Sequence, residues 1–515
     1  MRGLQQRGER RIAAALRIAL VAVLLALQVA VVVLLAYLLE QRAAIVYAIL
    51  QAAGLVVAVS VYNRPGDAMY KFTWIMLILA VPVVGLILYM LWSGEAQRRR
   101  LQRRVPHPEE EPESVRMRGE MDLDRLARSS PDWARLAKSL YRRGFPVYRN
   151  TRIEYLPEGK VFLDSVIDAC QRAERFIFLE YFILAEGEIW DRLSAILRDK
   201  AGAGVEVKII FDDFGNIKRF GGETIDALRR SGVEVYVFNP VHRYVNRLYF
   251  NYRDHRKIAC IDGDIAYTGG VNVGDEYANR IVRFGYWKDS GVRLEGDGAW
   301  GLTTAFLGML RFLGAEPNHE RDYYRPHGDV RAEGLCQPFT DGPQNNPDNP
   351  AEDTFLQLIA GAKRFLYITT PYFIPDDTVL RALYIAGDGG VDVRLMLPEI
   401  PDHHFTDLVA DSHVGALLEH GVKVYRYTPG FLHQKTVMVD REVAFVGSVN
   451  MDYRSFELHY EDGVLLYGAP AVEDLLEDMD AIMDQSHLVT IEKWNKRSWY
   501  RRAVERFLRL FAIWM

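Results

Sequence analysis

The sequence predicts an α/β protein built from two pseudo-twofold-related halves behind an N-terminal membrane region. Three observations predict this class. A motif that begins at His255 recurs, with the same residue types in the same order, at His433. Segments typical of strands alternate with amphipathic segments typical of helices ahead of each copy. The N-terminal region, by contrast, consists largely of long apolar runs.

The membrane region is predicted to cover residues 1–97, with candidate spans at 12–39, 43–61 and 72–92. About 20 apolar residues cross a bilayer core as a helix. A cleaved signal peptide is the alternative for the first run, but the run is too long and two more follow it. A buried core helix is the alternative for the other two, and their lack of amphipathic periodicity argues against it.

The charges that flank the runs bear on orientation. Arginines crowd the chain before the first run (Arg2, Arg7, Arg10 and Arg11), and "RRRLQRR" follows the third. Positive flanks favour the cytoplasm, so both ends favour the same side, which three full spans cannot satisfy. The second run is the shortest and holds Gln51, so it could lie shallow or re-enter. We expect a multi-pass protein with a cytoplasmic catalytic part.

The remaining chain reads as a repeat. Residues 98–131 form a charged linker, 132–316 the first half, 317–353 a connection rich in Pro, Asn and Gly, and 354–490 the second half. Strand-like segments at 175–184, 204–215 and 232–240 match segments at 364–375, 390–402 and 421–430. Strand–helix–strand order predicts right-handed crossovers, and therefore a mixed or mostly parallel sheet flanked by helices in each half.

The C-terminal segment, 491–515, is predicted to be a basic amphipathic helix. Basic residues alternate there with Trp499, Phe507 and Trp514, a composition typical of helices that lie in a membrane interface. The alternative is a helix packed on the domain with a solvated basic face.

Composition narrows the class of function. The chain is 49% hydrophobic and 25% charged, as in ordinary globular proteins. Its formal net charge of -5 gives no support for nucleic-acid binding. The three cysteines, Cys170, Cys260 and Cys336, have no metal-ligand spacing, so we expect buried, reduced thiols.

The doubled motif carries the chemistry. Residues two apart on a strand share a face, so His255 and Lys257 point the same way, as do His433 and Lys435. Each motif continues into a hairpin that turns near its aspartate, and small residues and an asparagine follow. The small residues allow a ligand to approach the backbone closely. These asparagines are Asn272 and Asn450.

The residue types suit a phosphodiester. Lysine and amide donors bind phosphate oxygens, and two histidines can serve as nucleophile and general acid. One motif supplies only one imidazole, so the halves must face each other with the site at their interface. Two such imidazoles titrate as a coupled pair.

Acidic residues complete the candidate set. Asp289 follows His255 and Glu461 follows His433, and we expect each acid to orient the histidine of its own half. The motif aspartates fall at the hairpin turns, and we interpret them as structural. The motif residues proposed for catalysis are His255, Lys257, Asp262, His433, Lys435 and Asp440, with phosphate binding or support from Asn272, Asn450, Asp289 and Glu461.

These residues resemble the paired HxKxxxxD motifs of the phospholipase D superfamily, through "HRKIACID…GGVN" and "HQKTVMVD…GSVN". The segments "NRLYFNYRDHRKIACIDG", "YITTPYFIPDD", "PGFLHQKTVMVD" and "NMDYRSFELHYED" are similar to bacterial cardiolipin synthases within that superfamily. One departure is His459, where members of that group usually have asparagine.

The resemblance implies two phospholipase D-like halves in a protein of the bacterial inner membrane. It implies transfer between two phosphatidylglycerol molecules, giving cardiolipin and glycerol, through a phosphohistidine on His255 with His433 as general acid and base. It also implies no metal and no cofactor, because lysines and amides supply the positive field. The alternatives are a phospholipase D-type hydrolase, another phosphatidyltransferase, or a non-catalytic membrane scaffold, against which the two complete motifs argue.

Overall fold

The computed structural model describes residues 26, 30, 41–64, 66, 68–92, 113–240, 251–328, 330–346, 348–510 and 512. Apart from residues 26 and 30, the predicted span 12–39 lies outside the described residues. So does the part of the predicted linker from 98 to 112.

The first half is built on a seven-stranded sheet. Its strands occur in the order β1-β9-β7-β6-β2-β3-β4. Only β2–β3 and β3–β4 are parallel pairs, and the other neighbours are antiparallel. The strands are β1 (Thr151–Leu156), β2 (Phe176–Tyr181), β3 (Glu206–Asp212), β4 (Glu234–Phe238), β6 (Lys257–Ile261), β7 (Ile265–Gly269) and β9 (Gly291–Gly296).

The second half repeats this sheet strand for strand. Its order is β10-β19-β17-β16-β11-β13-β14, extended at the last edge by β20 (Ser486–Leu488). Parallel pairing is again confined to one side, β11–β13 and β13–β14. The repeat and the mixed sheets predicted from the sequence are confirmed, although antiparallel pairs outnumber parallel ones. The strands are β10 (Leu335–Asp341), β11 (Phe365–Thr369), β13 (Asp392–Pro398), β14 (Lys423–Tyr427), β16 (Thr436–Val439), β17 (Val443–Gly447) and β19 (His459–Tyr467).

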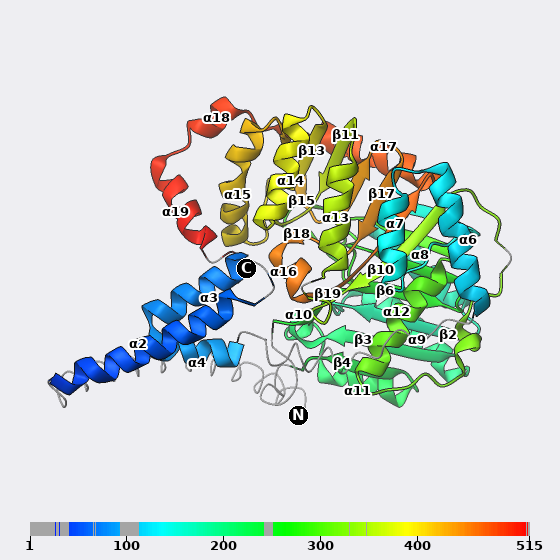
Figure 1. Cartoon of the computed structure of the whole chain (residues 1–515). Helices are drawn as coiled ribbons and strands as arrows, with labels where there is room; N and C mark the ends of the chain where they lie inside the picture. The colour runs from blue at the N-terminus through cyan, green and yellow to red at the C-terminus, as the bar shows by residue number, and fades with distance from the viewer. Residues whose placement is uncertain are drawn as a thin grey trace.

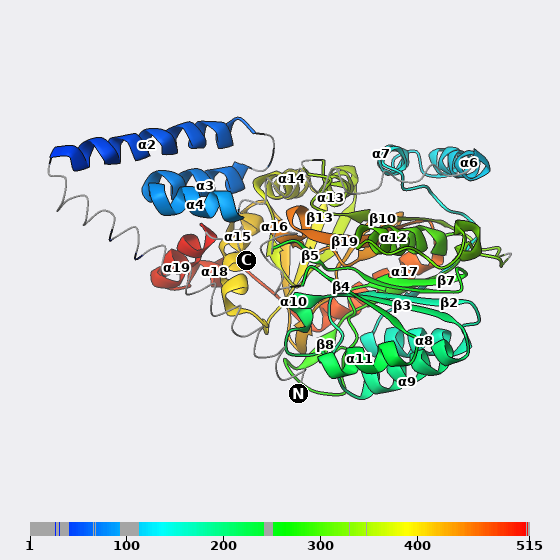
Figure 2. The ribbon, with the colours of Figure 1, turned by 90° about the horizontal axis from the view of Figure 1, so that it is seen from below.

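Helices cover the outer faces of both sheets and two more lie between them (Figures 1 and 2). The inner pair is α12 (Ala299–Phe312) and α17 (Pro470–Asp484), and one buried apolar cluster joins both helices to strands of both sheets. Burying apolar surface from the two halves in one core holds the sheets face to face. The outer helices are α8 (Gly159–Arg172), α9 (Glu188–Gly202), α11 (Gly222–Arg230), α13 (Pro350–Gly361), α14 (Asp377–Asp388) and α15 (His404–Glu419).

Two short parallel pairs connect the halves directly. β5 (Arg253–Asp254) of the first half pairs with β19 of the second. β15 (Gly430–Leu432) of the second half pairs with β8 (Tyr286–Lys288) of the first. These exchanged strands lead straight into the two histidine motifs and so fix the geometry of the site.

The N-terminal helices project from the α/β body, as Figure 1 shows in blue. They are α2 (Gln41–Tyr62), α3 (Ala68–Ala80) and α4 (Pro82–Trp92). Within α2, residues 45–62 are long and apolar enough to cross a membrane.

The predicted span 72–92 is not one helix, because the chain breaks at Pro82 and α4 folds back on α3. Trp74 of α3 and Tyr89 of α4 lie with ring centroids 5.4 Å apart. Gly85 permits this turn, since a Cβ there would meet the carbonyl oxygen of Leu77 at 2.5 Å. At 1.5 Å rise per residue, the two helices are only about 20 and 17 Å long. Each is too short for a bilayer core of about 30 Å.

Two predicted boundaries also change. Part of the linker is helical, as α6 (Glu113–Ser129), and α7 (Ala134–Arg142) packs into the core of the second half, not the first. Trp133, at the start of α7, donates from Nε1 to Glu442 Oε2 at 3.0 Å. The predicted connection supplies β10, an edge strand of the second sheet. These segments pack against the second half because they cover apolar surface between β10 and α13 that would otherwise be exposed.

The C-terminal segment forms two helices, α18 (Ile491–Asn495) and α19 (Trp499–Arg509), where one was predicted. Ser498 caps α19 by accepting a hydrogen bond from the backbone N–H of Arg501. The buried side of α19 carries Glu505, which binds Arg497 and Arg501. Arg501 also reaches Asp411 of α15 at 2.6 Å, so an ionic network docks the helix on the domain.

Candidate active site

The two motifs meet at the interface of the halves, as the sequence predicts. His255 directly follows β5, and its backbone N–H donates to the carbonyl of Tyr460 at 2.9 Å. His433 directly follows β15, and its N–H donates to the carbonyl of Lys288 at 2.7 Å. Each histidine therefore follows a short strand that pairs with a strand of the other half. The two strand pairs bring both rings to the interface between the halves.

Each histidine is bonded to the acid of the opposite half. His255 Nδ1 lies 3.0 Å from both carboxylate oxygens of Glu461. His433 Nδ1 lies 2.6 Å from Asp289 Oδ2. The prediction that Asp289 orients His255 and Glu461 orients His433 is wrong. The exchanged strands explain the result, because the β5–β19 pair sets residue 255 beside 461 and the β8–β15 pair sets residue 433 beside 289.

The bonds to the acids fix the tautomers. An ionised carboxylate only accepts hydrogen bonds, so Nδ1 of each ring carries the proton. In a neutral ring, Nε2 then keeps its lone pair. Both acids are fully buried, while His255 and His433 retain 7% and 6% exposure. A substrate can therefore reach the rings and not the acids.

The small residues after each motif serve the acids. Ser448 Oγ donates to Glu461 Oε2 at 2.5 Å. Gly270 occupies the matching place in the first half, where a Cβ would lie 2.1 Å from Asp289 Oδ1. From the sequence, these positions indicate only space for a ligand, and the role of the Ser448 hydroxyl was not predicted. The difference between "GG" and "GS" was the available signal.

The two lysines are arranged alike. Lys257 Nζ donates to the carbonyl of His255, and Lys435 Nζ donates to the carbonyl of His433. An ammonium group has three protons, so each lysine has two further donors after this bond. Both side chains are buried. The pair can present positive charge and donors to a phosphate.

Burial and charge set the protonation of the site. Burial lowers the pKa of His255 well below its ordinary value, and the charges of Lys257 and Lys435 lower it further. Burial lowers the pKa of His433 to about 4, with Lys435 acting in the same direction and Asp289 against it. Burial also lowers the pKa of Lys257 to about 8 and that of Lys435 to about 7. Both imidazoles are therefore neutral in the free site. Because the charges of both lysines lower the pKa of both histidines, the four groups act electrostatically as one site.

The motif aspartates stand apart from the rings, at the hairpin turns. Asp262 and Asp440 adopt left-handed backbone angles, with φ of 55° and 54°. Asp262 accepts from the backbone N–H groups of Glu174, Arg175 and Phe176, at 2.7 to 2.9 Å. Asp440 does the same for residues 363–365, at 2.8 to 2.9 Å. The contacts of both aspartates agree with the structural interpretation.

The two asparagines are not equivalent. Asn272 accepts from the N–H of Ile183 at 3.0 Å and donates to the hydroxyl of Tyr277 at 2.9 Å. Its amide is largely occupied within the first half, which weakens its predicted role as a phosphate donor. Asn450 Oδ1 is buried and has no hydrogen-bond partner in the described part of the chain. Of the two, Asn450 is the better candidate for contact with a ligand, and its unpartnered oxygen would accept from a hydroxyl group of that ligand.

The walls around the rings also differ. His255 lies against Phe182 and His459, with ring centroids 5.1 and 5.4 Å away. His433 lies among aromatic rings at 5.3 to 5.8 Å, those of Tyr277, Trp287 and Phe431.

Two further residues near the site were not predicted from the sequence. Arg454 donates from Nε to Nε2 of His459 at 3.3 Å. Asp462 accepts from the backbone N–H of Lys257 at 3.4 Å. Asp462 directly follows Glu461, so its position beside the predicted acid was the signal that could have identified it.

One trio could hold a metal ion. Ligand atoms of His255, His459 and Glu461 lie within 4.8 Å of one another. His255 Nδ1 is already bonded to Glu461, so a metal bound through that nitrogen would displace the bond that orients the ring. The trio therefore suits an inhibitory metal ion, which competes with the His255–Glu461 hydrogen bond, better than a catalytic one.

Comparison with known proteins gives the family. The model of the cardiolipin synthase phospholipase D-like domain matches residues 166–281 and 355–483, and the model of the phospholipase D-nuclease N-terminal region matches residues 49–94. A cardiolipin synthase of Halalkalibacterium halodurans is 33% identical over 446 residues, 85% of this chain and 88% of that protein. One of Listeria innocua is 32% identical over 465 residues, 88% of this chain and 95% of that protein.

A solved structure shares the fold. The crystal structure of phosphatidylserine synthase from Haemophilus influenzae aligns with a TM-score of 0.56 at 15% identity, covering 72% of this chain and 94% of that one. The identity of the relatives over most of their length, together with the two matched domains, decides the assignment. This chain belongs to the cardiolipin synthase family of phospholipase D-like proteins.

Proposed function

We propose that this protein is a membrane phosphatidyltransferase that makes cardiolipin and glycerol from two molecules of phosphatidylglycerol. One observation carries the proposal: two neutral imidazoles, each oriented by a buried carboxylate of the opposite half, share a site with two buried lysines. The names of the relatives support the choice of substrate and product.

In the first step, Nε2 of His255 attacks the phosphorus of one phosphatidylglycerol. The nitrogen–phosphorus bond forms as the bond to the glycerol oxygen breaks, and His433, protonated with the phosphate bound, gives its Nε2 proton to that oxygen. The phosphate's negative charge favours this protonated state. Lys257 and Lys435 neutralise the charge on the phosphate oxygens. Glu461 stabilises the positive charge that develops on the attacking ring.

In the second step, a hydroxyl of a second phosphatidylglycerol attacks the same phosphorus. His433, now neutral, takes the proton of that hydroxyl as the oxygen–phosphorus bond forms. The bond to His255 breaks and the ring returns to its neutral state. The net change is exchange of one glycerol for one phosphatidylglycerol on a phosphatidyl group, which gives cardiolipin.

The competing function is hydrolysis, in which water replaces the second lipid. The apolar walls at Phe182, Trp287 and Phe431 favour a lipid acceptor because they disfavour ordered water beside the rings. The test is to supply membranes that contain the protein with labelled phosphatidylglycerol. We expect labelled cardiolipin with release of glycerol, and no such product from the His255→Ala variant. Phosphatidic acid as the sole product would refute transfer, and full activity of His255→Ala would refute the site.

The fold of the N-terminal helices suggests a topology. We propose that α2 crosses the bilayer and that α3 and α4 form a re-entrant hairpin. Together with the crossing predicted from the sequence at 12–39, this gives two crossings and puts both arginine-rich flanks on the cytoplasmic side. Two crossings leave both flanks on the same side of the membrane, which three crossings could not do. In this proposal the run that does not cross is the third apolar run and not the second.

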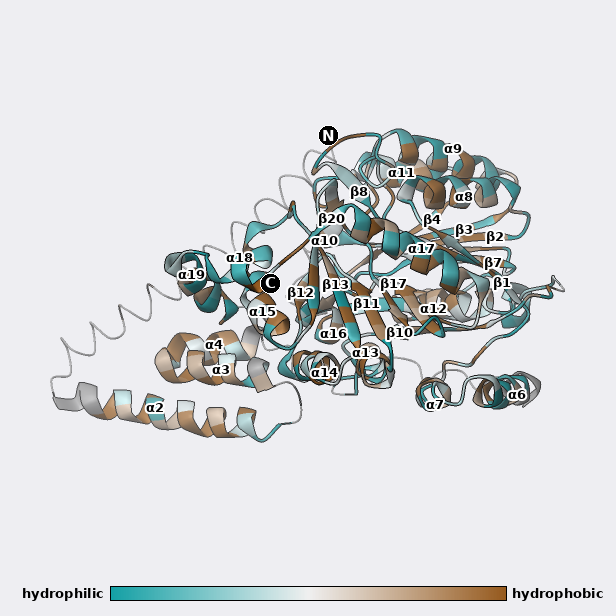
Figure 3. Ribbon diagram, turned by 90° about the horizontal axis from the view of Figure 1, so that it is seen from above, coloured by the Kyte–Doolittle hydropathy of each residue, from teal (hydrophilic) through white to brown (hydrophobic). Residues whose placement is uncertain are grey.

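The outer face of α19 supports a membrane-facing orientation of the body. Trp499, Tyr500 and Phe507 are 74%, 66% and 60% exposed, while Glu505 on the opposite side is buried. Exposed aromatic residues beside arginines are typical of interfacial helices. Figure 3 shows α19 beside the apolar helices α3 and α4, so a single bilayer could contact all three.

A further inference from the structure

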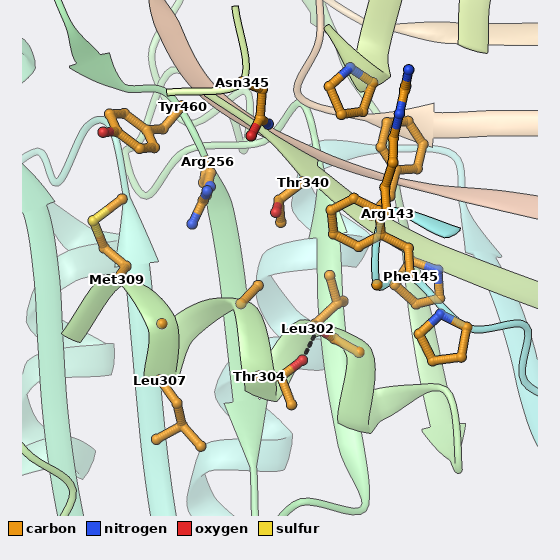
Figure 4. Close-up of a pocket in the computed structure, with 18 of the residues that line it drawn as sticks. Arg143, Phe145, Arg256, Leu302, Thr304, Leu307, Met309, Thr340, Asn345 and Tyr460 are labelled. Carbon is orange, nitrogen blue, oxygen red and sulfur yellow. Dashed lines mark hydrogen bonds between the residues drawn. The ribbon is translucent and has the colours of Figure 1, made fainter. Parts of the chain in front are cut away.

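A cavity lies behind the active site. It has a volume of about 560 Å³, within the range of small-molecule sites. Its walls come from α12, from β10, and from the segment after α7 that leads to β1 (Figure 4). None of the proposed catalytic residues lines it. The family assignment and the proposed mechanism give it no role.

The wall of the cavity is amphipathic. Apolar side chains such as Leu302, Met309 and Phe145 form much of it, as Figure 4 shows. The charged residues that line it are four arginines and one aspartate: Arg143, Arg256, Arg311, Arg321 and Asp348. Three of these arginines pair with acids that lie outside the lining: Arg143 with Asp353, Arg256 with Glu180 and Arg311 with Glu316. Their remaining N–H groups still make the wall rich in hydrogen-bond donors, which suits a ligand with an anionic head and an apolar body.

Three hydrogen-bond donors of the lining are buried and have no acceptor among the described residues. They are Nη1 of Arg143, Nε of Arg256 and the hydroxyl of Tyr460. Arg256 and Tyr460 are 5% and 2% exposed. A buried donor without an acceptor costs about 1–3 kcal/mol. A ligand rich in acceptors would satisfy these donors when it takes the place of water in the cavity.

The cavity touches the strands that carry the proposed nucleophile. Arg256 stands between His255 and Lys257, and Tyr460 immediately precedes Glu461. Because side chains alternate along extended chain, the catalytic residues point to one side and Arg256 and Tyr460 to the other. The two are also in mutual contact, with the Arg256 guanidinium 5.4 Å from the Tyr460 ring. A ligand bound here would therefore contact the segments that position the His255–Glu461 hydrogen bond.

We propose that this cavity is a second binding site, which takes a small anionic amphiphile: a phosphate monoester whose oxygens meet Arg143, Arg256 and Tyr460 and whose apolar chain lies along α12. The site is separate from the catalytic histidines, and its ligand is not consumed.

Gly308 offers a selective way to block the site. It lies on α12 in the wall of the cavity, and a Cβ added there would meet no atom within 4 Å. A leucine at this position therefore fills the cavity without a clash at its Cβ, and it favours the helix over glycine. Gly308→Ala is the matched control, because it makes the same backbone change and leaves the cavity open.

The test uses the full chain in nanodiscs of phosphatidylcholine, with hexyl phosphate as the probe and calorimetry as the measurement. We expect hexyl phosphate to bind at least roughly tenfold more tightly than inorganic phosphate or 1-hexanol, since each of these lacks one half of the recognition. Gly308→Leu should abolish this binding and keep transferase activity, while Gly308→Ala should keep both. Arg143→Gln should weaken binding roughly 10- to 150-fold, the worth of one charged hydrogen bond.

The controls separate this site from others. Arg152→Gln removes an exposed arginine that is paired with Glu295 and does not line the cavity, and it should leave binding unchanged. Equal affinity for 1-hexanol and hexyl phosphate would reduce the cavity to an apolar void. Unchanged binding in Gly308→Leu would place the probe elsewhere, the active site included. Either result would overturn the proposal.

Discussion

The exchange of acids between the halves makes a prediction that separates the roles of the two histidines. If His255 is the nucleophile, then Glu461, its partner across the interface, supports attack on phosphorus. Asp289, the partner of His433, then supports protonation of the leaving oxygen. Pairing within each half would give the reverse assignment. The variants Asp289→Asn and Glu461→Gln, each isosteric with the native residue, distinguish the two.

The expected losses follow from the geometry. The 2.6 Å contact of Asp289 with His433 is fully buried at the acid. Loss of a charged hydrogen bond of this kind costs about 1.5–3 kcal/mol, or roughly 10- to 150-fold in rate. An amide can also lock the ring in the wrong tautomer, and in a serine protease the same change costs roughly 10⁴-fold. We therefore expect each variant to lose roughly 10²- to 10⁴-fold in kcat with phosphatidylglycerol.

The assay compares two leaving groups. Phosphatidyl-p-nitrophenol expels an anion that needs no proton, so it bypasses the general acid in the first step. Single-turnover release of p-nitrophenol should therefore be nearly normal in Asp289→Asn and remain slow in Glu461→Gln. Rescue of Glu461→Gln in place of Asp289→Asn would refute the assignment of roles. Equal loss in both variants would show that the acids act only on the shared structure of the site.

Three further outcomes are expected. The lysine charges that bind phosphate are present below the pKa values of about 7 for Lys435 and about 8 for Lys257, so kcat/KM should fall as pH rises through this window. In Lys435→Arg the fall should begin nearer pH 8, and an unchanged pH profile in this variant would show that Lys435 does not cause the fall. Asp440→Ala removes an acceptor from three backbone N–H groups and should lower stability by about 2 kcal/mol in thermal unfolding, with kcat per folded molecule unchanged; a loss of kcat at equal stability would mean a chemical role. Zinc should inhibit through His255, His459 and Glu461 while chelators leave activity intact, and His459→Asn should relieve the inhibition; activity that requires added metal would contradict this reading.

The fold could be predicted from the sequence because the internal repeat is visible in the residue pattern. Matching strand segments and the two motifs at their ends gave two similar sheets, and the hairpin aspartates gave their turns. The acid pairing could not be predicted in the same way. It depends on β5, β8 and β15, strands of two or three residues, which are too short to show any periodic pattern.

Other differences have similar physical causes. Pro82 and Gly85 were visible in the third apolar run, but composition alone does not tell a tolerated proline from a sharp turn. The turn depends on the approach of Gly85 to the backbone of α3, a contact between residues far apart along a straight helix. Likewise, α7 joins the core of the second half because of apolar surface that a later part of the chain provides.

The departures from symmetry are as informative as the repeat. Two identical imidazoles in identical surroundings would titrate alike, whereas double displacement needs one ring neutral and the other able to hold a proton. The protein meets this need by varying the neighbours of a duplicated motif. His255 has Glu461 backed by Ser448, with His459 at its side, and His433 has a short bond to Asp289. Burial and both lysines lower the pKa of His255 well below its ordinary value, and the same influences lower the pKa of His433 to about 4 against the charge of Asp289. In the proposed mechanism, His433 carries the proton when an anionic phosphate binds, and His255 attacks as the neutral ring.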